Sequence, residues 1–208
     1  MLCAICYPFY MDRKDLEQIA DFLYETGMLS KTPRSGFFFL GSGEQSVAEH
    51  INRVCYIGYC LAQMNGKVDV GKVVQMCLFH DISESRISDL NYVHQKYTTR
   101  LEEKAHEDLA SSLPFGGSVK AVIDEYEERQ SPESLLVKDA DNLEFILSLK
   151  EQYDIGNERA KTWIEPAVLR LKTEEGKGLA AVIMEIPSDR WWFSEKNDEW
   201  WVNRNKQK

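Results

Sequence analysis

The sequence predicts an all-α protein. Apolar residues recur at three- and four-residue steps through most of the chain, which is the spacing of one face of a helix. The sustained alternation of apolar and polar residues that marks a half-buried strand is nearly absent. A length of 208 residues, of which 43% are hydrophobic and 28% charged, fits one globular domain with a sizeable core. We therefore expect a single domain over residues 1–208.

The first helix is predicted over residues 12–26, and Gly27 ends it. The segment 29–45 contains a proline and several glycines and is predicted to be a loop, with the apolar run 37–40 as one extended segment. Long ordered loops inside compact domains are often functional, so this one is a candidate lid or pocket wall. The alternative is simple packing against the core.

The next helix has clear start and stop signals. Ser46 and Glu49 have the spacing of a capping box, and Gly66 follows the last apolar position of the pattern. These signals predict a helix from residue 47 to residue 65, with His50 in its first turn.

Asp69 can cap another helix, predicted over residues 70 to about 83, and residues 89–97 are predicted to be a loop. Five more helical patterns follow, over residues 98–112, 118–129, 134–154, 158–173 and 177–185. The tail is Trp-rich, in residues 188–193 and 199–202, and is too aromatic for a free end. We expect it to pack on the domain or on a second subunit.

The charge balance and the cysteines limit the partners and the compartment. A net charge of -9 disfavours binding to nucleic acid or to an anionic membrane, whereas a small anionic substrate remains compatible with a locally positive pocket. No uncharged apolar run approaches the roughly 18 residues of a membrane-spanning helix. The odd number of cysteines, five, fits thiols in a reducing compartment, so we expect a cytoplasmic protein.

Ligand-type residues interrupt apolar stretches on separate predicted helices. They are His50, the pair His80 and Asp81, and Asp141. Taken singly, each has a structural explanation, such as a packed histidine or a capping aspartate. Together, two imidazoles and two carboxylates would suit one divalent transition-metal ion, namely Mn²⁺, Fe²⁺, Co²⁺, Ni²⁺ or Zn²⁺, and Mg²⁺ is also compatible.

Three segments carry a resemblance to a known family. Residues 46–50 (SVAEH), 79–84 (FHDISE) and 137–143 (VKDADNL) resemble the motifs of HD-domain phosphohydrolases, and the surrounding spacing resembles their 5′-deoxynucleotidase branch. The resemblance covers about residues 14–173 and leaves 174–208 as a C-terminal helical, Trp-rich extension. It implies an HD-domain helical bundle and a homodimer.

Carried over residue by residue, the resemblance implies that His50, His80, Asp81 and Asp141 are the metal ligands. Both Asp139 and Asp141 are candidates for the last position, and the family places its ligand directly before the Asn-Leu pair, which favours Asp141. Asp139 is then expected to face solvent or a polar partner beside the site.

The resemblance also assigns roles around the metal. Glu84 lies three residues after Asp81 and, on a continuing helix, would share its face and move a proton; the alternative is an exposed glutamate at a helix end. Arg34 matches a phosphate-binding arginine, for which a guanidinium is well suited. Asp89 matches a cleft residue whose carboxylate would bond a sugar hydroxyl or hold the pocket shut, and its alternative role is to cap or turn the chain.

The sequence departs from that branch at two places. Leu90 to His94 lacks the proline that follows the cleft aspartate in the branch, and Ser35 and Gly36 separate Arg34 from the next aromatic residue. The choice between deoxyribose and ribose therefore stays open.

We thus expect a metal-dependent phosphohydrolase, above all a 5′-nucleotidase that converts nucleoside 5′-monophosphates to nucleoside and phosphate. One alternative keeps the metal and changes the ester to a nucleoside triphosphate, a cyclic nucleotide or an alarmone. The other alternative is a nonenzymatic, metal-binding regulatory module.

Overall fold

The computed structural model describes residues 11–193 and confirms the all-α prediction. Within this range the only β-type pairing is an isolated bridge between Pro33 and Ser46. The helices are α1 (Arg13–Thr26), the 3-10 turn η1 (Gly27–Ser30), α2 (Phe37–Leu40), α3 (Val47–Asn65), α4 (Val70–Phe79), α5 (Glu84–Ile87), α6 (Tyr92–Gln95), α7 (Glu102–Ser111), α8 (Gly116–Glu128), α9 (Pro132–Asp154), α10 (Glu158–Val168), α11 (Glu174–Glu185) and α12 (Arg190–Phe193).

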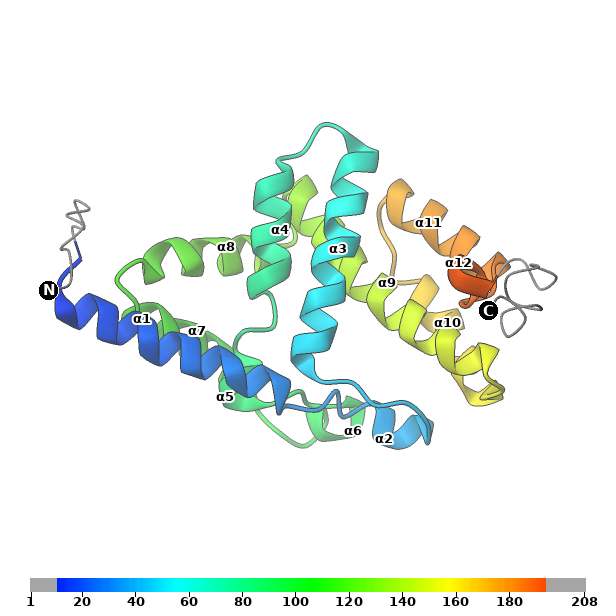
Figure 1. Cartoon of the computed structure of the whole chain (residues 1–208), viewed down its shortest axis with the longest axis horizontal. Coiled ribbons are helices and arrows are strands. Elements are labelled where there is room, and N and C mark those ends of the chain that lie inside the picture. Colours follow the sequence, from blue (N-terminus) through cyan, green and yellow to red (C-terminus); the bar gives the residue numbers. More distant parts are fainter. Residues whose placement is uncertain (1–10, 194–208) are drawn as a thin grey trace, which may run out of the picture.

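The helices are arranged around α9. Figure 1 shows α3, α4 and α9 side by side at the centre, with α1, α7 and α8 toward one end and α10 to α12 toward the other. Helix α9 contacts α3, α4, α8, α10 and α11, and six of its apolar residues are almost completely buried: Leu136, Val137, Ala140, Leu143, Ile146 and Leu149. Each such Leu or Ile contributes roughly 2 kcal/mol relative to an exposed position. The core is therefore built around the helix that carries Asp141.

Local capping determines where α3 begins. The Ser46 hydroxyl accepts a hydrogen bond from the backbone N–H of Glu49, and the Glu49 carboxylate accepts one from the backbone N–H of Ser46, which confirms the capping box. At the other end Gly66 adopts φ 69°, a left-handed conformation that favours glycine. His50 therefore lies in the first turn, as predicted.

The helix predicted over residues 70–83 ends early, at Phe79. In a continuing helix the Cys77 carbonyl would accept the N–H of Asp81. Here the His80 Nδ1 lies 2.8 Å from that carbonyl oxygen, and the following backbone bonds change to three-residue spacing. The histidine side chain thus replaces a backbone donor, and the chain turns at Asp81.

Two predicted loop segments contain short helices. The run 37–40, predicted to be extended, is helix α2, and Gly41 ends it at φ 80°. The predicted loop 89–97 contains α6, because the Asn91 side chain caps the N–H groups of Val93 and His94. Most other predicted ends are within a few residues of the observed ones.

Asp139 is buried, so the first of its two expected environments, solvent, was wrong. Its carboxylate accepts the backbone N–H groups of Lys172 and Thr173 and the Thr173 hydroxyl, at 2.6–3.1 Å. These bonds tie α9 to the segment before α11. They also explain why the helix predicted to reach residue 173 ends at Val168.

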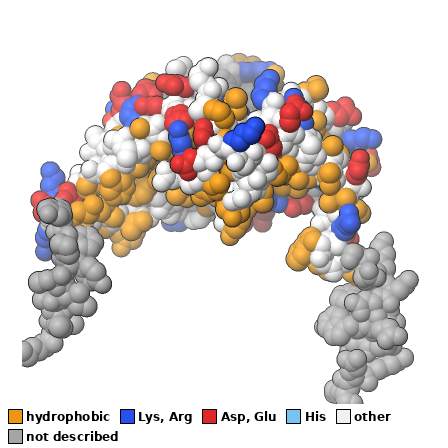
Figure 2. All heavy atoms as spheres, turned by 90° about the horizontal axis from the view of Figure 1, so that it is seen from above, with side chains coloured by type: hydrophobic (Ala, Val, Ile, Leu, Met, Phe, Trp, Pro, Cys, Tyr) orange, Lys and Arg blue, Asp and Glu red, His pale blue; other side chains and the backbone are white. Residues whose placement is uncertain are grey.

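The described part of the tail does not bury its tryptophans. Trp191 and Trp192 in α12 are 85% and 58% exposed. Packing of the tail on the domain is not observed at these two residues, and packing on a second subunit stays a prediction; residues 199–202 lie outside the described range. The face drawn in Figure 2 intermingles acidic and basic side chains and gathers apolar ones along its lower margin. Among residues 11–193, no helix combines the length and apolarity needed to cross a bilayer.

We predict that Gly176→Ala destabilises the protein. A Cβ at residue 176 would lie 2.5 Å from Oδ2 of Asp139, an atom that its hydrogen bonds hold in place. The free energy of unfolding, measured by urea denaturation, should fall by about 2 kcal/mol. Gly178→Ala is the matched control on the same helix, because its Cβ meets nothing within 4 Å. It should leave stability unchanged or raise it by up to about 1 kcal/mol. Equal stabilities would contradict this account.

Candidate metal centre

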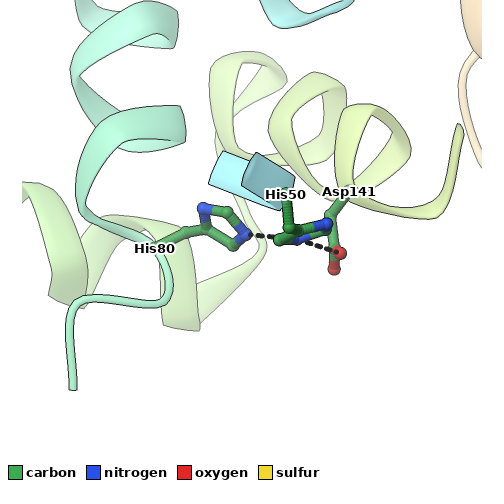
Figure 3. Close-up of side chains that lie close together, drawn as sticks. All are labelled: His50, His80 and Asp141. Carbon is green, nitrogen blue, oxygen red and sulfur yellow. Dashed lines mark hydrogen bonds and ion pairs between the residues drawn. The ribbon is translucent and has the colours of Figure 1, made fainter. Parts of the chain in front are cut away.

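Four ligand-type side chains from three parts of the fold converge (Figure 3 draws three of them). The Nε2 atom of His50, on α3, lies 3.3 Å from Nε2 of His80 and 3.4 Å from Oδ1 of Asp141, on α9. Oδ2 of Asp81 lies 3.5 Å from Nε2 of His50 and 3.3 Å from Nε2 of His80. Ligand atoms of His50, His80 and Asp141 all lie within 4.8 Å of one another.

These distances fit one divalent cation. Bonds of about 2.1 Å place neighbouring ligands roughly 3.0 Å apart in an octahedron and roughly 3.4 Å apart in a tetrahedron. The two imidazoles are buried, whereas the side chains of Asp81 and Asp141 are 21% and 17% exposed. The donor set is therefore closed on the protein side and open toward a cavity.

Both carboxylates are ionised at neutral pH. Burial opposes ionisation of Asp81, but the imidazoles of His80 and His50 outweigh it and lower the pKa of this carboxyl. Burial likewise opposes ionisation of Asp141, and Lys138, whose Nζ lies 2.7 Å from Oδ2, and His50 hold its pKa well below the ordinary value. A metal would find its oxygen ligands already deprotonated.

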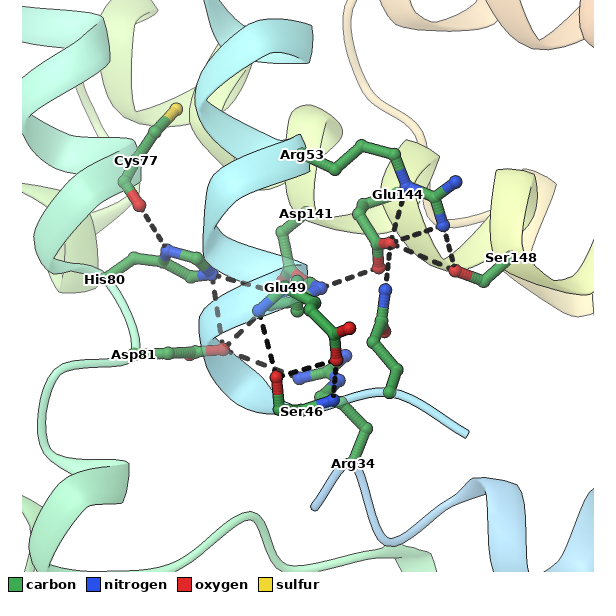
Figure 4. A network of polar contacts seen from close by, with 12 residues as sticks. Arg34, Ser46, Glu49, Arg53, Cys77, His80, Asp81, Asp141, Glu144 and Ser148 are labelled. Carbon is green, nitrogen blue, oxygen red and sulfur yellow. Dashed lines mark hydrogen bonds and ion pairs between the residues drawn. The ribbon is translucent and has the colours of Figure 1, made fainter. Parts of the chain in front are cut away.

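Each imidazole is fixed through Nδ1, the ring nitrogen that faces away from the cluster (Figure 4). Nδ1 of His80 lies 2.8 Å from the Cys77 carbonyl oxygen, and Nδ1 of His50 lies 2.6 Å from Oε2 of Glu144. Burial opposes ionisation of Glu144, but His50 and Arg53 outweigh it and lower the pKa of its carboxyl to about 2. Both rings consequently direct Nε2 toward the same point.

A cavity of about 730 Å³ opens beside this cluster. Its lining includes charged side chains and a set of aromatic ones, called here the aromatic wall. The charged residues are Arg34, Asp81, Glu84, Asp89, Arg100, Lys138, Asp141 and Arg170. The aromatic side chains include Phe37, Phe39, Tyr92, Phe145 and Trp163.

Glu84 is buried, so the alternative of an exposed glutamate was wrong. Burial, and then Asp81 and Asp89, raise the pKa of its carboxyl to about 9. The prediction assumed that the helix continues past Asp81, and it does not. The tight turn that follows still brings Glu84 to the cavity.

Arg34 and Asp89 lie on the same wall. Nη1 of Arg34 is 3.5 Å from Oδ2 of Asp81, and Asp81 and Asp89 raise the pKa of the guanidinium despite its burial. Oδ2 of Asp89 accepts the backbone N–H of Ser35 at 2.8 Å, and the Asp89 carbonyl accepts the Ser35 hydroxyl at 2.8 Å. Asp89 therefore fixes the loop that carries Arg34, which makes the segment 29–45 a pocket wall.

Three residues at the centre were missed from the sequence. Glu144 and Lys138 are each three residues from Asp141 on one helix face, which is a signal that could have found them. Arg100 precedes α7, with Nη2 3.8 Å from Oε1 of Glu84, and no periodicity marks it.

The sequence model described as HD domain matches residues 26–183. The chain belongs to the HD domain family. HD-domain phosphohydrolases are metal-dependent, so the enzyme class predicted from the sequence is confirmed and the nonenzymatic alternative is set aside.

Individual relatives agree with this membership. A 5′-deoxynucleotidase of Dictyostelium discoideum is 33% identical over 144 residues, which are 63% of this chain and 75% of the relative. A conserved hypothetical protein from Pyrococcus furiosus has 30% identity and a TM-score of 0.67, covering 80% of this chain and 97% of that one. The cyanophage S-2L HD phosphohydrolase, solved with dA and one catalytic Zn²⁺, shares the fold at 22% identity, a TM-score of 0.51 and coverage of 78% and 96%.

We predict that Asp141→Asn and Asp139→Asn differ in metal binding. Loss of a hydrogen bond that orients a metal ligand costs roughly 10- to 100-fold in metal affinity. Asp141→Asn should weaken metal binding by more than this, because it removes the charge of a proposed ligand. Asp139→Asn should retain the metal, because Asp139 bonds only the segment before α11. Metal content after dialysis, by mass spectrometry, and circular dichroism for folding check both. If only Asp139→Asn lost the metal, Asp139 and not Asp141 would be the ligand.

Proposed function

We propose that the protein is a 5′-nucleotidase that hydrolyses (deoxy)ribonucleoside 5′-monophosphates to nucleoside and inorganic phosphate. The observation that carries this proposal is one cavity beside the four-ligand cluster, lined by the cluster's two carboxylates, a largely buried arginine and a buried glutamate with a raised pKa. The curated relatives, all named 5′-deoxynucleotidases, support the substrate class.

His50, His80, Asp81 and Asp141 would hold one divalent transition-metal ion, and the donor set admits Mn²⁺, Co²⁺, Fe²⁺, Ni²⁺ and Zn²⁺, with Mg²⁺ less favoured by imidazole. Such an ion supplies Lewis-acid chemistry, since it neutralises phosphate charge and makes water acidic enough to attack near neutral pH. The protein residues have to bring the ester to this point, orient it and move protons.

Arg34 would grip the phosphate. A guanidinium can donate two parallel hydrogen bonds to phosphate oxygens, and Asp89 holds the Arg34 loop through Ser35. Arg100 lies on the same cavity with only long contacts, 3.8 Å to Glu84 and 3.8 Å to Glu102, and is a second phosphate donor.

Glu84 would carry the proton. Its Oε2 is buried and has no hydrogen-bond partner among residues 11–193, and its raised pKa lets the carboxyl hold a proton near neutral pH. Hydrolysis requires a proton on the departing 5′-oxygen, which this atom can supply and recover from water. Asp89, also on the cavity, can accept a bond from a sugar hydroxyl, and the aromatic wall can contact the base.

A nucleoside triphosphate is the second candidate. Arg100, Lys138 and Arg170 line the cavity in addition to Arg34, and these cations could meet further phosphate groups.

We also propose that the protein acts in the cytoplasm as a homodimer. Cys55, Cys60 and Cys77 carry free thiols, as a reducing compartment favours. The exposed Trp191 and Trp192 are candidates for contact with a second copy.

The test is phosphate release by metal-stripped protein refilled in turn with Mn²⁺, Co²⁺, Mg²⁺ or Zn²⁺. The panel pairs deoxy- and ribonucleoside monophosphates with the triphosphates and cyclic nucleotides. We expect metal-dependent release from monophosphates. Turnover of triphosphates alone would replace the leading proposal by the second one. No phosphate release from any compound of the panel would contradict both proposals.

We predict that Glu84→Gln lowers kcat by roughly 10²- to 10⁴-fold, because the amide cannot transfer the proton. Metal content should not change, since Glu84 is outside the ligand set. Glu102→Gln is the matched control: it removes the other carboxylate at 3.8 Å from Arg100 but does not line the cavity. The proposal requires that Glu84→Gln is slow while Glu102→Gln keeps the wild-type kcat. Equal kcat values for the two variants would rule out the proton-transfer role.

A further inference from the structure

Glu144 is a buried carboxylate outside the proposed ligand set, and its two oxygens contact different groups. Oε2 lies 2.6 Å from Nδ1 of His50. Oε1 accepts hydrogen bonds from three side chains. These are Gln45 through Nε2 at 2.7 Å, Arg53 through Nε at 2.9 Å and Nη2 at 2.8 Å, and Ser148 through Oγ at 3.0 Å.

The contact to His50 determines which ring nitrogen carries the proton. An ionised carboxylate only accepts hydrogen bonds, so Nδ1 of His50 must donate to Glu144. In the neutral imidazole the lone pair is then on Nε2, the atom that faces His80, Asp81 and Asp141. A proton on Nε2 instead would point at the cluster and block coordination.

The tautomer of His80 is determined in the same way, by a different partner of Nδ1. Its Nδ1 faces the Cys77 carbonyl oxygen, which is also only an acceptor. For His50 this requirement is met by a side chain, so it can be altered by mutation without changing the backbone.

We propose that Glu144 is a positioning residue that selects the His50 tautomer with a free Nε2 and so prepares the site for a divalent cation. This inference rests on the proposed metal site. Glu144 lies one helical turn after Asp141 on α9, so one rigid helix face supplies both a ligand and the group that orients another ligand.

The decisive variant is Glu144→Gln, which keeps size and shape. The donors of Gln45, Arg53 and Ser148 would hold the amide oxygen at the Oε1 position. The amide NH₂ group would then face Nδ1 of His50 and donate to it, which moves the imidazole proton to Nε2. We expect the dissociation constant for Zn²⁺ or Mn²⁺ to rise by roughly 10- to 100-fold.

Tautomers are read directly by long-range ¹H–¹⁵N NMR of the imidazoles in metal-free protein at alkaline pH, where the rings are neutral. The chain has 4 histidines, so the spectrum is tractable. In the wild type His50 should be protonated at Nδ1, and in Glu144→Gln at Nε2. His80 should be unchanged in both.

Two further variants separate this role from a structural one. Glu151→Gln removes the other carboxylate that pairs with Arg53, at 2.6 Å, but does not contact His50, so tautomer and affinity should match the wild type. Glu144→Asp keeps an obligate acceptor, so the tautomer should be retained and affinity should fall less than in Glu144→Gln. If Glu144→Gln fails to fold by circular dichroism, Glu144→Asp and Glu151→Gln still test the assignment.

The outcomes distinguish this inference from the proposed function. Wild-type protein that binds no divalent cation in titration calorimetry would remove the metal site itself. Wild-type binding together with an unchanged tautomer and affinity in Glu144→Gln would overturn the positioning role alone. The same holds if Glu144→Asp shifts the proton to Nε2.

Discussion

The structure depends on one electrostatic constraint, the convergence of ionised carboxylates in a partly dehydrated pocket. Asp81 and Asp141 both approach Nε2 of His50. Like charges held this close repel, and burial strengthens the repulsion. The surrounding cations, Arg34 near Asp81 and Lys138 at Asp141, offset part of it, and a divalent cation would offset the rest. The packing of α3, α4 and α9 is what holds these groups in place against that repulsion.

Helix α9 divides its acidic residues by direction. Successive residues are turned by roughly 100° around a helix, so Asp139 and Asp141 point about 200° apart, whereas Glu144 returns to the side of Asp141. Asp139 accordingly bonds the segment before α11, and the other two meet the centre. Because Asp139 and Glu144 are buried and Asp141 is largely so, each needs its own donors. One helix thereby anchors the core and the site together.

The sequence was informative wherever a residue's role follows from its own helix. The capping box correctly predicted His50 in the first turn of its helix, and the apolar surroundings of His80 and Asp141 correctly predicted that the first is buried and the second lies within a packed helix. The sequence was uninformative where a residue's role depends on a contact that helical periodicity does not show. The burial of Asp139 depends on Thr173, and the end of α4 depends on a side-chain bond that replaces a backbone bond. Periodicity registers neither, because it reports faces of helices and not long-range hydrogen bonds.

The groups around the cavity differ in how firmly the fold holds them. The proposed ligands come from or adjoin long packed helices, whereas Arg34 is on a loop joined to Asp89 through Ser35. Ser35 and Gly36 are the residues that separate the arginine from the next aromatic residue, where this chain departs from the deoxynucleotidase pattern. The departure thus falls in the pocket wall and leaves the metal cluster intact. Loops vary more readily than the core that supports them, so this part of the pocket can change without moving the side chains of the cluster.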